Sequence, residues 1–103
     1  MKDGIYRFDL EMDTPLGRRR GNLELIIEKN WMNGYFTMFT RTIPIRNGTL
    51  TGSSLCFEGD MKTLTKMLPY KAEGTITQSA LEMVISTQQG AYPVKGMLAE
   101  VRR

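Results

Sequence analysis

Apolar and polar residues alternate with a period of two along most of this chain. The clearest segment, residues 6–12, reads YRFDLEM, so that every second residue is apolar and every intervening one is charged. Because successive side chains of a β-strand point to opposite faces, this pattern predicts a strand with one buried and one solvated face. A helix would instead need apolar residues three and four positions apart. The alternation recurs down the chain and indicates an all-β protein.

Turn-forming residues divide the alternating pattern into short segments. Residues 13–17 read DTPLG, in which proline sets φ and glycine accepts a positive φ. The pairs Asn33-Gly34 and Asn47-Gly48 are strong hairpin signals, and we expect a turn at each. Strands are then predicted over about 22–28, 35–41 and 42–46, and Pro44 in the last of these suggests an edge position or a bulge.

The second half of the chain contains a short internal repeat. Residues 48–57 (GTLTGSSLCF) align without gaps with residues 74–83 (GTITQSALEM). Each copy predicts a hairpin with a tight turn, at Gly52-Ser53 and at Gln78-Ser79. The last strands are expected over about 81–87 and 92–101. Residues 61–68 do not fit this pattern, and before Pro69 they suit either a helical turn or two or a lid-like loop.

About eight short strands without a crossover helix favour one architecture. We predict an antiparallel up-and-down meander that closes into a small β-barrel, because closure removes exposed sheet edges. A two-sheet sandwich is the alternative. With 103 residues the chain has the length of one domain, so the barrel is expected to span residues 1–103.

The composition excludes several classes of chemistry. The chain has no histidine and one cysteine, which rules out an imidazole base, Ser-His and Cys-His pairs, an intramolecular disulfide and a Cys-rich zinc site. Glycines occur singly and form no phosphate-binding or dinucleotide-binding motif. We therefore expect no cofactor and no metal.

The ends and charges of the chain suggest a compartment and exclude some partners. Residues 1–7 lack the apolar core of a signal peptide, and no segment has the apolar length of a membrane span, so a cytoplasmic protein without membrane contact is predicted. The lone Cys56 fits a reducing compartment. The net charge of the chain is +3, and three of its arginines are adjacent at residues 18–20. Because these arginines lie between turn residues, they predict a solvated hairpin rim and no nucleic-acid surface.

The layout resembles the lipocalin-like, or calycin, barrels, and the phrases GTLTGS and GTITQS resemble short uncharacterised bacterial barrels. Gly4-Ile5-Tyr6 opens the first strand where lipocalins have Gly-x-Trp, and Arg102 and Arg103 close the last. The resemblance implies a basic residue from the barrel end packed across the Tyr6 ring. It carries no catalytic residue over to this chain.

An eight-stranded barrel is filled by side chains or admits one small ligand. The chain has eight methionines, whose flexible thioethers suit an adaptable apolar pocket, although they also fill gaps in a small core. We therefore predict a binding module for a small hydrophobic molecule. Its candidate ligand-binding residues are the apolar Tyr6, Phe8, Phe36, Met38, Phe57, Tyr70, Met83 and Tyr92, with Arg41 to orient the ligand or to form a surface ion pair.

Two other functions remain open. A barrel isomerase, cyclase or enzyme accessory subunit would need an acid-base set, for which Tyr6, Arg7, Asp9, Glu11 and Arg41 are the available residues. A structural oligomer would have a filled core and no ligand. A cavity of a few hundred cubic ångströms with a polar group inside would favour binding. If the interior is filled and all charges lie outside, the binding and the enzyme interpretations both fail, which leaves the structural oligomer.

The third predicted strand is apolar on both faces. Phe36 and Met38 share one face, while Tyr35, Phe39, Ile43 and Ile45 are expected on the other. A small barrel buries only one of these faces, so a homo-oligomer is predicted, with this outer face and Trp31 in the contact.

Overall fold

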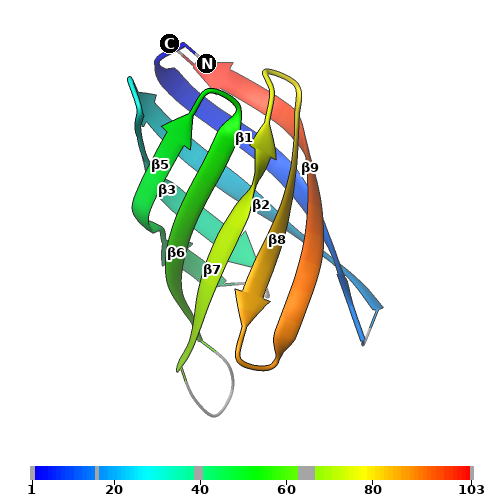
Figure 1. The fold of residues 1–103 in the computed structure, drawn as a ribbon. Helices are drawn as coiled ribbons and strands as arrows, with labels where there is room; N and C mark the ends of the chain where they lie inside the picture. Colours follow the sequence, from blue (N-terminus) through cyan, green and yellow to red (C-terminus); the bar gives the residue numbers. More distant parts are fainter. Residues whose placement is uncertain (1, 16, 39–40, 63–66, 103) are drawn as a thin grey trace.

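Nine strands form one antiparallel sheet in the computed structural model, which describes residues 2–15, 17–38, 41–62 and 67–102 (Figure 1). The strands are β1 (Gly4–Thr14), β2 (Gly17–Glu28), β3 (Trp31–Met38), β4 (Arg41–Pro44), β5 (Arg46–Thr51), β6 (Ser54–Lys62), β7 (Met67–Ile76), β8 (Ala80–Thr87) and β9 (Gly90–Arg102). Almost the whole described chain is strand, as its alternation predicted.

The sheet closes on itself as a barrel. Its strand order runs from β2 through β1, β9, β8, β7, β6 and β5 to β3 and β4, and a further pairing of β2 with β3 completes the circle. The short strands β4 and β5 both pair with β3 and occupy one position in the wall, on either side of Ile45. The wall therefore has eight positions, which confirms the predicted eight-stranded meander and excludes the sandwich.

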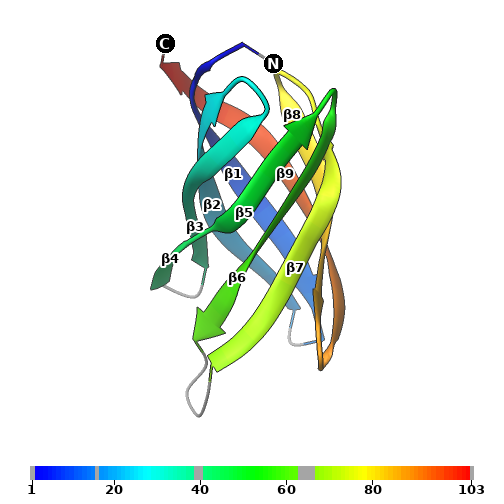
Figure 2. The same ribbon diagram turned by 60° about the vertical axis from the view of Figure 1, so that its left-hand side comes forward.

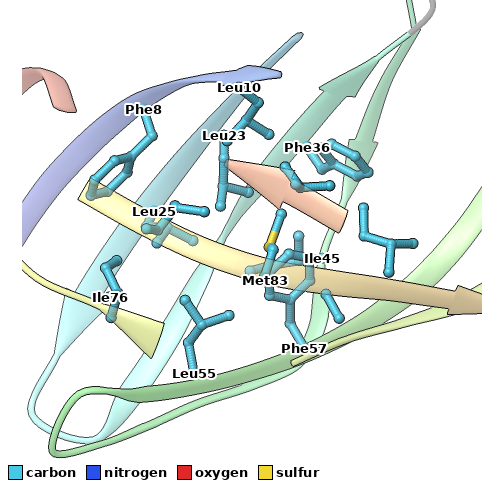
Figure 3. Packing of buried hydrophobic residues seen from close by; sticks show 14 of the residues in the cluster. Phe8, Leu10, Leu23, Leu25, Phe36, Ile45, Leu55, Phe57, Ile76 and Met83 are labelled. Carbon is cyan, nitrogen blue, oxygen red and sulfur yellow. The ribbon is translucent and has the colours of Figure 1, made fainter. Parts of the chain in front are cut away.

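One face of every strand points into the barrel and is apolar. In β1 the buried residues Tyr6, Phe8, Leu10 and Met12 alternate with exposed charged ones. The other strands supply the rest of the core, part of which is drawn in Figure 3. Among the described residues every buried side chain is apolar or aromatic. Burial of this single inner surface is the main source of stability for so small a domain.

Glycines on the inner face let the strands approach one another closely. A Cβ at Gly34 of β3 would lie 1.8 Å from the carbonyl oxygen of Glu24 in β2. A Cβ at Gly74 of β7 would lie 2.0 Å from the carbonyl oxygen of Glu82 in β8. A barrel of eight strands needs strongly bent walls, and glycine permits such bends because it has no side chain.

The two Asn-Gly pairs are not turns, and the hairpin predictions at these positions are wrong. The turn between β2 and β3 falls earlier, at Lys29, which has φ of 56°, and Asn30. Gly34 lies inside β3, where its backbone contacts β2. Asn47-Gly48 lies inside β5, where Asn47 has φ of 53° and the register with β6 shifts between Arg46 and Thr49. This second pair forms a bulge, which bends the strand as a turn residue would.

The repeated segments form equivalent hairpins, as predicted. Leu50 pairs with Leu55 across the first turn, and Ile76 pairs with Leu81 across the second. All four side chains are buried. The two copies therefore repeat the inner face as well as the turn.

Three further predictions concern the ends of strands. Pro44 lies in β4, which pairs only with β3 among the described residues, so the predicted edge position is confirmed. Residues 61–62 and 67–68 belong to β6 and β7, so the helical-turn interpretation is wrong for them; residues 63–66 lie outside the described ranges. Arg102 lies on the outer wall, where its guanidinium contacts the Glu24 carboxylate at 2.9 Å. It therefore does not pack across the Tyr6 ring, which is buried inside the barrel, and the expectation is wrong for Arg102; Arg103 is outside the described residues.

Replacement of Gly74 by alanine tests the role of the inner glycines. The added Cβ would meet the backbone of β8, so we expect a loss of about 3 kcal/mol in the free energy of unfolding. Gly52→Ala is the matched control, because Gly52 has φ of 60° but no atom within 4 Å of its added Cβ; it should cost about 1 kcal/mol. Urea unfolding measures both, and equal losses would contradict the close-packing explanation.

Candidate functional site

The barrel interior collects most of the residues predicted to bind a ligand. Seven are buried in one apolar cluster and Tyr92 packs against it half-buried, whereas Arg41 is exposed at the start of β4. The buried seven are Tyr6, Phe8, Phe36, Met38, Phe57, Tyr70 and Met83. The structure thus brings eight of the nine together and leaves the proposed orienting cation outside.

Side chains occupy the interior (Figure 3). Two hollows formed by the described residues open on the outer wall. One of about 810 Å³ lies over β1, β2 and the start of β3, and another of about 780 Å³ crosses β2, β1, β9 and β8. By the criterion stated above, this filled interior counts against the binding and the enzyme interpretations, and a ligand inside the barrel would have to displace core side chains.

Tyr70 carries the one buried polar side-chain atom without a hydrogen-bond partner among the described residues. Its side chain is packed edge-on against two phenyl rings, with centroids 5.7 Å from Phe36 and 6.1 Å from Phe57. Its hydroxyl oxygen has no partner, although the residue is only 4% exposed. An unpaired buried hydroxyl costs free energy, so a phenylalanine would suit this position better in an isolated core.

Burial raises the pKa of the Tyr70 hydroxyl well above the usual tyrosine range. The positive charge of Arg46 opposes this rise, and the negative charge of Asp60 adds to it. The hydroxyl is therefore protonated at any physiological pH. It offers a hydrogen-bond donor inside an apolar interior.

The Tyr70 ring crosses from β7 onto β6. Tyr70 pairs directly with Gly59 of β6, and a Cβ at Gly59 would lie 2.8 Å from the Tyr70 hydroxyl oxygen. The ring thus covers a position without a side chain, and its hydroxyl lies on the side of the ring away from β7. Gly59 is the residue that makes room for this arrangement.

Strand β6 loses its pairing with β5 at Gly59. Strand β6 pairs with β5 as far as Glu58, opposite Arg46, whereas from Gly59 to Lys62 its described pairing is with β7 only. Strand β4, which would continue β5 along this edge, pairs with β3. Figure 2 shows β4 and the lower part of β6 on either side of this interruption. Arg46 and Asp60 form an ion pair of 3.2 Å where the β5–β6 pairing ends.

Tyr6 gives the contrasting case of a buried tyrosine. It is 1% exposed, and its hydroxyl donates a 2.6 Å hydrogen bond to the carbonyl oxygen of Lys2. The barrel therefore satisfies one buried hydroxyl and leaves the other unpaired. This difference identifies Tyr70 as the polar centre of the candidate site.

The structure separates the predicted acid-base set. Tyr6 points into the barrel, whereas Arg7, Asp9 and Glu11 are exposed on the outer wall. Glu11 contacts Arg18 at 3.4 Å and Arg20 at 4.0 Å, so these arginines form the solvated hairpin rim that the sequence predicted. In the described ranges no three acidic or cysteine side chains gather as a metal site would require. No helix there is long and apolar enough to cross a membrane.

The expected two-faced apolar strand is only partly present. Tyr35 and Trp31 are exposed on the outer wall, but Ile45 is buried and Ile43 packs against the core. The alternation restarts in β4 after β3 ends at Met38, so both isoleucines point inward. Phe39 lies outside the described residues.

Comparisons with known proteins provide no relative for this chain. No family model, no curated protein and no solved structure matches it. Sequence reasoning named Tyr70 only as an apolar lining residue and overlooked its unpaired hydroxyl. The alternation of β6 places Gly59 on the inner face, but its pairing with Tyr70 required the register.

Phenylalanine substitutions distinguish the two buried tyrosines. Tyr70→Phe removes an unpaired hydroxyl, so we expect the unliganded protein to gain about 1–3 kcal/mol in free energy of unfolding. Tyr6→Phe removes a paired hydroxyl and should lose about 1 kcal/mol. Urea unfolding at neutral pH measures both changes, and a loss in Tyr70→Phe would show that its hydroxyl has a partner.

The raised pKa of Tyr70 also predicts a dependence on alkaline pH. The unfolded chain ionises near the ordinary tyrosine pKa of about 10, while the folded chain keeps Tyr70 protonated. Below pH ~10 this group leaves the free energy of unfolding independent of pH, and as the pH rises further the ionisation of the unfolded chain lowers it. Tyr70→Phe should flatten this part of a stability profile measured by urea unfolding between pH 8 and pH 11 (roughly the range around the tyrosine pKa).

Proposed function

We propose that the protein binds a small, uncharged, mainly apolar molecule inside the barrel. The Tyr70 hydroxyl donates a hydrogen bond to an oxygen acceptor on this ligand. The observation that carries the proposal is the buried hydroxyl without a partner, set among aromatic rings. Ligand sites of this kind are largely apolar, with a few polar groups that fix orientation.

The chemistry of the interior restricts the ligand. The described inner face has no charged side chain that would compensate a carboxylate or an ammonium group, and burial of an uncompensated charge is very costly. A protonated tyrosine donates to a carbonyl, ether or hydroxyl oxygen. We therefore expect an aldehyde, ketone, ester or alcohol of modest size.

Flexible methionine side chains allow the packed interior to rearrange around a ligand. Met61 pairs with Leu68 in the last inward row before the β6–β7 connection, next to the row of Gly59 and Tyr70. At 8% exposure, Met61 is the most exposed of the buried core residues in the described ranges. A flexible thioether can change rotamer at low cost. In this proposal the ligand enters past Met61 and replaces part of its contact with the core.

The proposal includes the kind of protein as well as its ligand. We place the chain as a lipocalin-like, calycin-type binding protein of bacterial origin that acts in the cytoplasm. The closed eight-stranded barrel supports the architectural part, and the half-buried free thiol of Cys56 fits a reducing compartment. The acidic residues of the predicted acid-base set lie on the outer wall, away from the interior that we propose as the ligand site, which favours binding over catalysis there.

Nile red tests the proposal, because it is apolar, uncharged and bears a carbonyl oxygen. We expect its fluorescence to rise on binding to the purified protein, with an affinity about 3–10-fold weaker in Tyr70→Phe, since one net hydrogen bond is lost. Tyr6→Phe is the matched control and should keep the wild-type affinity. Absence of binding to the wild-type protein, or equal affinities for wild type and Tyr70→Phe, would contradict the proposal.

A further inference from the structure

We propose that two copies of this chain form a twofold dimer, in which Trp31 of each copy fills the outer-wall hollow of the other. This inference concerns the outside of the barrel and is independent of the ligand proposed for the inside. It rests on a projecting apolar side chain and a hollow that lie on the same face.

Trp31 projects from the outer wall at the start of β3. Its neighbour Met32 points inward, so the alternation of β3 directs Trp31 to solvent, where it is 74% exposed. It is the only tryptophan of the chain. A side chain of this size is among the most strongly enriched at protein interfaces, because its burial contributes more than that of smaller residues.

The hollow, which Trp31 itself helps to line, has an apolar floor. Ile5 of β1 pairs with Ile26 of β2, and both side chains lie on the outer face together with the backbone of Gly4. The hollow has a volume of about 810 Å³ and is open to solvent, which leaves ample space for an indole ring. Tyr35, 48% exposed, extends the apolar surface along β3.

The arrangement fits a second copy of the same chain. A twofold interface uses one patch twice, so the patch must present both a projection and the surface that receives it. Trp31 and the Ile5-Ile26 floor meet that condition. The rim carries both signs of charge, with Lys29 next to Glu28 and Asp3, so a twofold axis can bring each lysine toward the acidic groups of the other copy. A partner with one sign of charge would meet repulsion on part of this rim.

The contact around the hollow must extend onto the neighbouring strands. Standard interfaces bury about 800 Å² on each partner, which is more than the hollow alone provides. The outer faces of the three strands β1, β2 and β3 supply a continuous surface around the hollow. No other layer of the described chain covers Trp31 there.

Sedimentation velocity over a range of concentrations tests the dimer. We expect a mass of twice 11.7 kDa for the wild-type protein at micromolar concentration, and at least about 30-fold weaker association in Trp31→Ala, as for the loss of an interface hot spot. Met97→Ala is the matched control, because Met97 is 72% exposed on the outer face of β9, away from the hollow. It should leave the mass unchanged.

The single tryptophan provides a second measurement. Its emission should move to longer wavelength when the wild-type protein is diluted and the dimer dissociates, and Ile26→Ser should show the dissociated spectrum at every concentration. Ile26→Ser keeps this reporter, and Trp31→Ala removes only an exposed side chain, so at least one variant keeps the fold. A monomeric mass at 100 µM (roughly the upper end of weak association), or equal effects of Trp31→Ala and Met97→Ala, would overturn the proposal.

Discussion

The structure depends on burying one apolar face of a short chain without leaving a sheet edge exposed. Alternation supplies the face, and the pairings of β1 with β9 and of β2 with β3 close the sheet into a barrel. A chain of 103 residues has little other means of gaining buried surface, because its surface-to-volume ratio is high. The inward rows of aromatic, aliphatic and methionine side chains therefore hold the wall together from inside. The curvature of the wall, the inner glycines and the packing of the core all follow from this closure.

Closure at this size requires tight curvature, and the glycines provide it. Gly34 and Gly74 allow backbones to approach where any side chain would collide with a neighbouring strand. Gly59 has a different role, since it accepts the ring of Tyr70. The same residue type thus shapes the wall in one place and makes room for a polar group in another. That group is an exception in an interior that is otherwise apolar throughout the described residues.

The fold was largely predictable from local patterns, while the candidate site was only partly so. Alternation, the repeat at residues 48–57 and 74–83, and the absence of long helical patterns predicted the meander and its hairpins. The Asn-Gly pairs misled the turn assignment, because the same dipeptide suits a turn, a bulge and a tightly bent strand. Eight of the nine residues predicted to bind a ligand lie in or against the core, whereas Arg41 is exposed because of its position in β4. The unpaired hydroxyl of Tyr70 could not be predicted, because a hydroxyl is unpaired only by virtue of what surrounds it.

The sequence by itself determined the class of fold and the inner and outer faces of the strands, because a period of two assigns each side chain to one side of a sheet. It also determined the absence of histidine chemistry and of an intramolecular disulfide. The tertiary structure decided which residues meet across strands. Register placed Tyr70 over Gly59 and Ile5 beside Ile26, and a register shift of one residue would have turned these side chains to the opposite face. Contacts between distant segments depend on that register and on curvature, neither of which a local pattern contains.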